Sequence, residues 1–345
     1  MDSRERFFAT IERRSVDRPA AWLGMPDVKS QPALFACYGV KNLHELKLAV
    51  GDDFYAVEVP YRSPTAGAIY AAFDWYMDGN VDAENRTLTA DGCFKDAEEP
   101  EDLGFFQWPD PARYIDRDEC LRRVEAAPAD KARLGMIWCA HFQDACASFG
   151  METALMNMVA NPELYEAVDA KILDFYLKAN EIFFEATRGR LDAVLIGNDM
   201  GSQRGLIISP EMVRRFVMPG CRKLVEQAHS YGLKVIYHSC GSIADVIPDL
   251  IAAGVDAVHP IQALAAGMDA RLLRERFGGQ VSFCGGVDTQ ELLVRGSQDD
   301  VRAKVRELRE LFPTGLIISP SHEAVMPDVP PENIRALFEE AQKIY

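Results

Sequence analysis

The chain has 345 residues, of which 48% are hydrophobic and 26% are charged, a composition typical of soluble globular proteins. Its 53 acidic residues outnumber its 37 basic residues, and the formal net charge of −16 argues against binding to nucleic acid or to anionic membrane surfaces. No apolar run approaches the roughly 18 residues of a membrane helix. The charged N-terminus lacks the apolar region of a secretory signal, so we expect a cytoplasmic protein.

Segments with the patterns of strands and helices alternate along the chain. Strands are predicted at Ala20–Leu23, Phe54–Val59, Leu134–Ala140, Ala193–Gly197, Lys234–His238, Ala257–Pro260, Val281–Cys284 and Leu316–Ser319. Helices are predicted at Arg4–Arg13, Arg113–Ala126, Pro162–Thr187, Pro210–Tyr231, Ile243–Ala253, Ala270–Phe277, Gln298–Leu311 and Pro331–Ile344. From about Leu191 onwards strand and helix follow each other regularly, which predicts a parallel sheet with helices outside.

Eight strands in a chain of this length fit a single (β/α)8 TIM barrel over residues 1–345, preceded by an N-terminal helix. The alternative is a doubly wound open sheet, which usually carries a glycine-rich phosphate-binding turn, and the sequence contains no such turn. The segment 64–98 interrupts the alternation. We interpret it as an insertion in the barrel, with a hairpin around Arg86–Phe94.

Nitrogen and sulfur side chains follow the predicted strands. His238 and Cys240 are two residues apart at a strand end, so their side chains face the same side, and imidazole and thiol are preferred zinc ligands. Because the ends of parallel strands converge at the mouth of a barrel, His322 after the last strand can join them. We therefore expect a zinc site of His238, Cys240 and His322, with Cys284 as a fourth candidate or a wall residue. The alternative is a core cysteine beside a hydrogen-bonded histidine.

Other residues at the strand ends are candidates for catalysis or for substrate contact. Asp199 and Asp288 are expected to bind substrate or to orient a ligand histidine, unless they form Asx turns or helix caps. The candidates for substrate contact are His141, Asn198, Met200, Gln203, Tyr237 and Gln262, with Gln143 beside the first of them. We interpret His259 as a packed histidine, and Glu323 as a residue of the loop surface rather than a general acid.

Together these residues resemble the uroporphyrinogen decarboxylase superfamily. The resemblance lies in residues 3–22, 197–220, 229–262, 283–293 and 320–339, and it spans nearly the whole chain. It implies a (β/α)8 barrel. The superfamily contains decarboxylases of uroporphyrinogen and zinc methyltransferases that pass methyl groups to or from the cobalt of a separate corrinoid protein.

Two segments distinguish these classes. The decarboxylases carry an arginine-rich segment near the N-terminus that binds the carboxylates of the porphyrinogen, whereas residues 23–28 here read LGMPDV and contain no arginine. The methyltransferases carry His-x-Cys after a strand and a third ligand, usually cysteine, after the last strand. His238 and Cys240 match this pattern, and His322 stands where the cysteine is usual.

The motifs DMGSQRG, HSCGSI and GGVDTQ look most like the first methyltransferases of O-demethylase systems. The resemblance implies that zinc acts as a Lewis acid on the ether oxygen of a methoxylated aromatic substrate, and that cobalt(I) of a partner corrinoid protein accepts the methyl group. The alternatives are methyl transfer from methylcorrinoid to tetrahydrofolate or to a thiol such as coenzyme M, uroporphyrinogen decarboxylation, and a catalytically inactive ligand- or corrinoid-binding barrel. No corrinoid-binding domain is recognisable in the sequence, so the corrinoid is expected to come with the partner protein.

Overall fold

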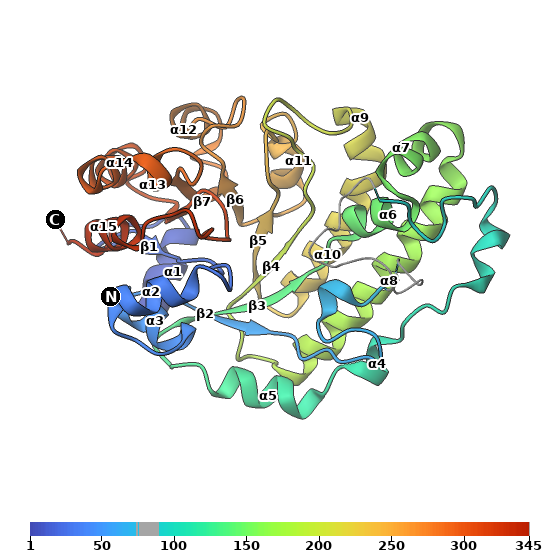
Figure 1. The fold of residues 1–345 in the computed structure, drawn as a ribbon, viewed down its shortest axis with the longest axis horizontal. Coiled ribbons are helices and arrows are strands. Elements are labelled where there is room, and N and C mark those ends of the chain that lie inside the picture. The colour runs from blue at the N-terminus through green and yellow to red at the C-terminus, as the bar shows by residue number, and fades with distance from the viewer. Residues whose placement is uncertain (74, 76–89, 345) are drawn as a thin grey trace.

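The computed structural model describes residues 1–73, 75 and 90–344. Eight strands form one curved sheet with helices around its outer side, and both termini lie on the same side of the molecule (Figure 1). The strands are β1 (Ala20–Ala21), β2 (Phe54–Glu58), β3 (Ala132–Trp138), β4 (Ala193–Gly197), β5 (Lys234–His238), β6 (Ala257–Ile261), β7 (Ser282–Val287) and β8 (Leu316–Pro320). All pairings between them are parallel.

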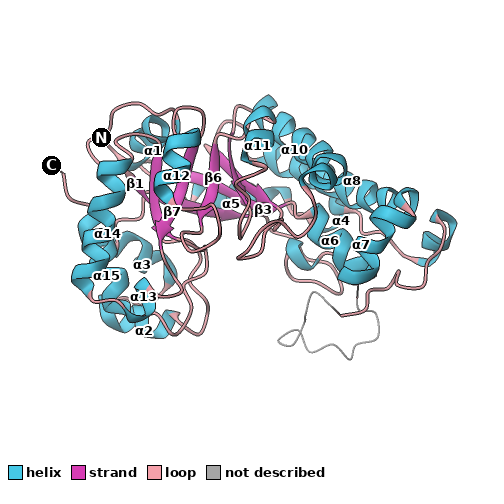
Figure 2. Cartoon of the chain, turned by 90° about the horizontal axis from the view of Figure 1, so that it is seen from above, coloured by secondary structure: helices cyan, strands magenta, loops and turns pink. Residues whose placement is uncertain are grey.

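The helices lie in two groups on either side of the strands when the molecule is seen from above (Figure 2). The α-helices are α1 (Ser3–Ile11), α2 (Gln31–Tyr38), α3 (Leu43–Ala49), α4 (Pro111–Tyr114), α5 (Arg117–Glu125), α6 (His141–Phe149), α7 (Met151–Ala160), α8 (Pro162–Ala186), α9 (Pro210–Met212), α10 (Met218–Ser230), α11 (Ile247–Ala252), α12 (Ala270–Phe277), α13 (Leu292–Arg295), α14 (Gln298–Leu311) and α15 (Pro331–Ala341). A π-helical turn, η4 (Val213–Val217), joins α9 to α10, and the 3₁₀ turns are η1 (Ile69–Ala71) and η3 (Pro100–Phe105).

The order of the strands is that of a barrel. It runs β1-β8-β7-β6-β5-β4-β3-β2, so neighbours in the sheet are neighbours in the sequence, apart from the pairing of β1 with β8. A doubly wound sheet instead reverses its order near the middle. The TIM barrel predicted from the alternation of strands and helices is therefore confirmed. The expected hairpin around Arg86–Phe94 falls largely outside the described residues, and its described part, 90–94, contains no strand.

Two side-chain carboxylates link β1 to β2 by hydrogen bonds. In the described part of the chain these two strands form no ladder, and one backbone hydrogen bond joins them, from the Asp53 N–H to the Ala21 oxygen at 2.9 Å. The Asp53 carboxylate accepts a hydrogen bond from the Ala21 N–H at 2.8 Å. The Asp52 carboxylate accepts one from the Leu23 N–H at 3.2 Å. These bonds take the place of the missing ladder at this end of the barrel.

The buried apolar side chains form two clusters, one inside the barrel and one between the strands and the surrounding helices. The inner cluster contains strand residues such as Leu195, Ile236 and Ile317, and Phe7 of α1 closes it at the amino end of the strands. The outer cluster packs the other faces of the strands against the helices. Side chains in a strand alternate between the two faces. The position of a residue in its strand thus decides whether it faces the barrel interior or a helix.

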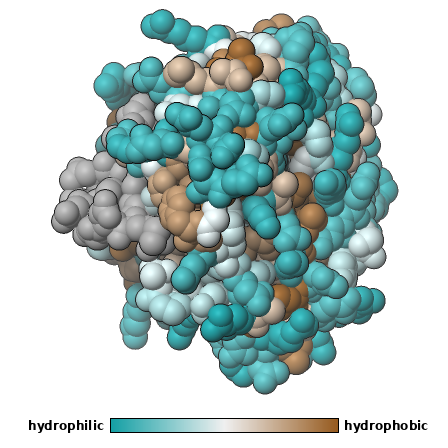
Figure 3. Space-filling view, turned by 90° about the vertical axis from the view of Figure 1, so that its right-hand side faces the viewer, coloured by the Kyte–Doolittle hydropathy of each residue, from teal (hydrophilic) through white to brown (hydrophobic). Residues whose placement is uncertain are grey.

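On the face shown in Figure 3, hydrophilic residues predominate, and apolar residues form scattered patches among them. Among the helices described here, none combines the length and the apolar character required to cross a membrane.

Candidate metal centre

The residues predicted as zinc ligands lie at the carboxyl ends of β5 and β8. His238 is the last residue of β5, Cys240 follows two positions later, and His322 lies two residues beyond β8. Along β5, Ile236 belongs to the inner cluster, whereas Tyr237 belongs to the outer one. His238 therefore points to the same side as Ile236, into the mouth of the barrel.

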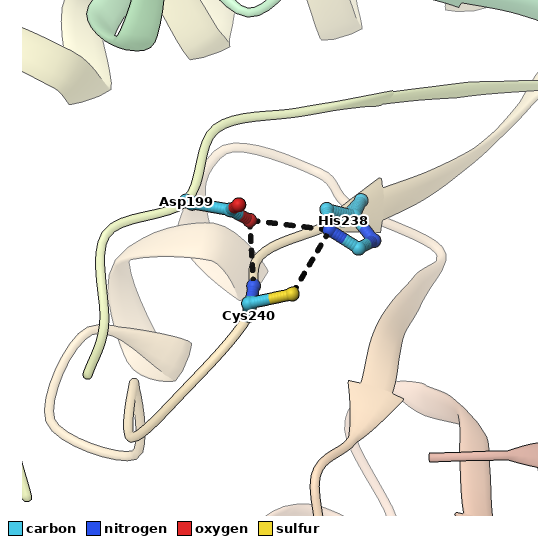
Figure 4. A group of neighbouring side chains, drawn as sticks. All are labelled: Asp199, His238 and Cys240. Atoms are coloured by element: carbon cyan, nitrogen blue, oxygen red, sulfur yellow. Dashed lines mark hydrogen bonds and ion pairs between the residues drawn. The ribbon is translucent and has the colours of Figure 1, made fainter. Parts of the chain in front are cut away.

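The side chains of Asp199, His238 and Cys240 converge (Figure 4). These three residues are the centre of a cluster of possible ligand atoms that is called the group below. Nε2 of His238 lies 3.4 Å from Sγ of Cys240 and 3.1 Å from Oδ1 of Asp199. The same Oδ1 accepts a hydrogen bond from the Cys240 N–H at 2.8 Å. A nitrogen, a sulfur and an oxygen, one from each residue, thus lie within 4.8 Å of one another.

The loop after β8 adds His322 and Glu323 to this group. Together with Cys240 they offer ligand atoms that also lie within 4.8 Å of one another. Oε2 of Glu323 is 3.5 Å from Nδ1 of His322 and 3.6 Å from Nδ1 of His238, and among the described residues it has no hydrogen-bond partner. Only 17% of the Glu323 side chain is exposed. The interpretation of Glu323 as loop surface is therefore wrong, because its carboxylate faces the other ligand atoms.

A further histidine and two tryptophans close the buried side of the group. Nδ1 of His259, a fully buried residue, lies 2.8 Å from Nδ1 of His238. The ring of Trp22 packs edge-on against His259, and the ring of Trp138 packs in the same way against His238. Trp138 has a φ of 67°, a backbone conformation that residues other than glycine rarely adopt. The fully buried ring of Trp22 keeps water away from His259 and so strengthens the electrostatic interactions on this side.

Carboxylates and histidines of the group pair opposite charges with one another. Burial lowers the pKa of His238, but the charge of Glu323 and the hydrogen bond with Asp199 outweigh it and raise this pKa well above its usual value. Burial raises the pKa of Asp199, yet its hydrogen bonds with His238 and Cys240 lower it to about 2. The hydrogen bond with Cys240 is the largest cause of the raised pKa of His322. Asp199 is thus ionised at neutral pH, and its counter-charge among the described residues is the protonated ring of His238.

Hydrogen bonds from outside the group hold its loops in place. The Gln143 amide bonds Asp199 twice, because its oxygen accepts from the Asp199 N–H at 3.0 Å and its nitrogen donates to Oδ2 at 3.2 Å. The Gln262 amide oxygen accepts from the Gly241 N–H at 2.6 Å. Gly241 has a φ of +83°, and a Cβ there would lie 2.3 Å from the backbone of Gly201. Only glycine fits this crossing of the two loops that carry Asp199 and Cys240.

The structure does not bring Cys284 or Asp288 to the group. Cys284 is fully buried in the inner core of the barrel, and this burial raises the pKa of its thiol. The Asp288 carboxylate accepts hydrogen bonds from the N–H groups of Glu291 and Leu292, at 2.7 and 2.9 Å. It holds the turn that leads into α13, which is the capping alternative to a catalytic role.

Three of the candidates for substrate contact are bonded inside the protein instead. The Asn198 amide donates to the Tyr237 hydroxyl at 3.2 Å and accepts from the Phe142 N–H at 2.8 Å. His141 is the first residue of α6 and is fully buried, with its Nδ1 2.7 Å from a carboxylate oxygen of Asp169. These side chains connect strands with helices and do not face the barrel mouth.

The remaining candidates differ in exposure. Met200 is fully buried, and its N–H donates to the Ser239 hydroxyl at 3.0 Å. Gln262 is half-buried beside the loop of Cys240, and Gln203 is exposed in the loop after β4. A bound molecule can therefore reach Gln262 and Gln203 but not Met200.

The donor atoms fit zinc. With Zn–S of about 2.3 Å and Zn–N of about 2.0–2.1 Å in a tetrahedral site, a bound sulfur and nitrogen lie about 3.5 Å apart. The Sγ–Nε2 distance of 3.4 Å between Cys240 and His238 matches this value. Within the described residues, Asp199 and Glu323 form ion pairs with histidines and with no lysine or arginine. A divalent cation would balance the negative charge of these carboxylates and of a thiolate.

A cavity of about 480 Å³ lies elsewhere, between α3, β2 and α5. None of the residues of the group lines it. Two arginines at its edge, Arg122 and Arg123, are already paired with Glu119, each at 2.9 Å. The ligand atoms of the barrel mouth, rather than this cavity, therefore mark the candidate site.

Comparison with known proteins agrees with the fold. The family model for uroporphyrinogen decarboxylase (URO-D) matches residues 119–344, which include β4, β5, β8 and the loops that carry the ligand atoms. Among curated proteins, none matches the sequence. The solved structure of a methyltransferase from Methanosarcina mazei is similar, with a TM-score of 0.70 and 18% sequence identity. The similarity covers 99% of this chain and 98% of the methyltransferase chain, and at this identity it shows a shared fold.

Proposed function

The chain belongs to the uroporphyrinogen decarboxylase family, and from this premise we propose that it is a zinc-dependent methyltransferase. In this proposal it moves a methyl group from a methoxylated aromatic substrate to the cobalt(I) of a partner corrinoid protein. The observation that carries the proposal is the approach of Nε2 of His238, Sγ of Cys240 and Oδ1 of Asp199 at the barrel mouth. The fold shared with a methyltransferase supports it.

His238 and Cys240 would hold the zinc ion, with His322 as the third protein ligand. All three are at strand ends, and Cys240 lies near both histidines. A catalytic zinc site has three protein ligands and leaves one position for water or substrate. The carboxylates of Asp199 and Glu323 contribute negative charge beside the ion.

A bound zinc ion supplies a Lewis acid that withdraws charge from the ether oxygen of the methoxy group. The residues of the chain prepare the place for this chemistry. Asp199 accepts the Cys240 N–H and so fixes the loop that carries the thiol. The buried side chains of Trp22 and His259 cover the inner side of His238 and keep water away from it. Donor atoms that are already in position need little rearrangement during the reaction.

We place substrate contacts at Gln203 and Gln262, because these are the candidates with exposed side-chain surface. Asp199, whose side chain is 33% exposed, reaches the same region. The corrinoid would arrive with the partner protein, as in the methyltransferases that the sequence resembles.

The test is a methyl-transfer assay with the zinc-loaded protein, cobalamin reduced to cobalt(I) and a panel of methoxylated aromatic compounds. Formation of methylcobalamin, followed by its absorbance, is the expected result, and Cys240→Ser is expected to abolish it. If the protein bound no zinc and methylated no cobalamin, the proposal would be abandoned.

The same preparation distinguishes the alternatives. Methylcobalamin offered together with coenzyme M or tetrahydrofolate tests transfer in the opposite direction. Incubation with uroporphyrinogen tests decarboxylation, the activity in the name of the family. Binding of a corrinoid protein without turnover in any of these assays would indicate an inactive barrel.

A further inference from the structure

The inner side of His238 faces another histidine. Strands β5 and β6 are paired in a register that sets His238 directly beside His259. The two Nδ1 atoms lie 2.8 Å apart, and the residues are 4% and 0% exposed. At this distance the nitrogens share a hydrogen bond, so one ring carries the proton at Nδ1 and the other accepts it.

We infer that His259 is a positioning residue: when a metal ion replaces the proton at Nε2 of His238, His259 accepts the hydrogen bond from Nδ1–H of His238 and keeps Nε2 directed at the ion beside Cys240. The inference rests on the proposed metal site and gives one of its ligands a defined tautomer. A neutral imidazole carries a single proton, so a proton at Nδ1 leaves Nε2 available to a metal. In the opposite arrangement His259 donates, and Nε2 of His238 carries a proton that points at Asp199, 3.1 Å away.

The surroundings of His259 hold its ring in a fixed position beside His238. The Trp22 ring packs against it with the ring centres 5.0 Å apart. Because the residue lies within β6 and not in a loop, its ring is held by the sheet as well as by this contact.

Glu323 is the competing acceptor. Metal-bound histidines often donate their second N–H to a carboxylate. Oε2 of Glu323 lies 3.6 Å from Nδ1 of His238, beyond hydrogen-bond distance, whereas Nδ1 of His259 lies at 2.8 Å. Glu323 is also carried by a loop, outside the strands. The geometry thus assigns the hydrogen bond to His259 and leaves Glu323 as a neighbouring charge.

The experiment measures zinc affinity by competition with a chelator. His259→Leu removes the acceptor, and we expect its dissociation constant for zinc to rise about 10- to 100-fold, the usual loss when an outer partner of a ligand histidine is removed. His259→Gln keeps an acceptor oxygen and is expected to bind zinc more tightly than His259→Leu. His141→Leu is the matched control, since His141 is equally buried but bonds Asp169 away from the group, and its affinity should equal that of the wild type.

A second measurement remains informative even where the leucine variant does not fold. In the zinc-loaded wild type, the ¹⁵N shifts of the imidazoles report which nitrogen holds the proton. We expect the proton of His238 at Nδ1 and that of His259 at Nε2. The reverse pattern would overturn the inference.

The outcomes separate this inference from the proposed function. If His259→Leu bound zinc like the wild type while Glu323→Gln bound it more weakly, the carboxylate and not the histidine would be the partner. The proposed metal site would then stand, and only the role of His259 would fall. If the wild type bound no zinc, the proposed function itself would fall.

Discussion

The two ends of the barrel bury charged groups in opposite ways. At the amino end, Asp53 accepts hydrogen bonds from Arg6 and Arg18 at 2.8 and 2.7 Å and from a backbone N–H. At the carboxyl end, Asp199 and Glu323 face histidines and a thiol, and within the described residues neither pairs with a lysine or an arginine. The first arrangement pairs its carboxylate with arginines, whereas the second pairs its carboxylates with histidines, which are also able to bind a metal ion. A buried group of the first kind supports the fold, and one of the second kind indicates a binding site.

The largest expected effect comes from removing the thiol at the carboxyl end. In Cys240→Ser, zinc content should fall from one ion per chain to nearly none, and methyl transfer should fall by about 10³-fold or more, since a Lewis acid contributes several kcal/mol to such a reaction. Metal analysis and the methylcobalamin assay measure both effects. The metal-free variant should unfold at the same urea concentration as the metal-free wild type. A variant that kept its zinc would contradict the assignment of the ligand.

A substitution at the amino end should instead lower stability and leave the affinity for zinc unchanged. Asp53→Asn leaves Arg6 and Arg18 buried beside a neutral group, and we expect a loss of about 3–5 kcal/mol in the free energy of unfolding. Urea unfolding followed by circular dichroism measures it. The folded fraction should bind zinc with the affinity of the wild type. Unchanged stability, or weaker zinc binding, would remove the distinction between the two ends.

Zinc itself should stabilise the fold through the carboxyl end alone. At a free concentration 100 times the dissociation constant, the ion should raise the free energy of unfolding by about 2.7 kcal/mol. Asp53→Asn should show the same increment, measured by urea unfolding with and without zinc. Cys240→Ser should show none, and an equal increment in this variant would mean that the ion binds elsewhere.

The smallest expected effect concerns Asp52, the neighbour of Asp53 at the amino end. Asp52 is fully buried, with the Lys47 ammonium 3.8 Å from its carboxylate, and burial raises its pKa from 3.8 to about 6. The folded protein thus holds this proton more firmly than the unfolded chain. The contribution of Asp52 to stability is full below pH 3.8 and declines as the pH rises towards about 6.

A comparison with Asp52→Asn should reveal how the contribution of Asp52 to the free energy of unfolding falls with rising pH. Between about pH 5 and about pH 7.5, the wild type should lose about 1 kcal/mol of stability relative to Asp52→Asn. Urea unfolding of both proteins across this range is the measurement. A difference that stayed constant with pH would show that the pKa of Asp52 is close to its unfolded value.

The sequence predicted the barrel and the centre of the group because both depend on local patterns. Strands β4 and β5 have the bounds read from the apolar runs. The period of two along β5 brings His238 and Cys240 together, as expected. The same period also sets Tyr237 on the outer face, so its place among the helices could have been inferred.

Other parts of the site depend on contacts between segments far apart in the chain, which a local sequence pattern does not show. His259 meets His238 only because of the register between β5 and β6. The position of Glu323 depends on the course of the loop after β8. His141 lies away from the mouth because Trp138, the last residue of β3, and Cys139 after it have positive φ, and α6 begins at His141. Register, loop path and backbone strain are decided by packing of the whole chain, which the sequence pattern does not show.

X-ray absorption at the zinc edge of the purified protein tests the central claim most directly. We expect one zinc ion per chain with a single sulfur neighbour at about 2.3 Å and nitrogen or oxygen neighbours at about 2.0–2.1 Å, and loss of the zinc signal itself in Cys240→Ser. A protein that bound no zinc, or a zinc ion surrounded only by nitrogen and oxygen, would contradict the account.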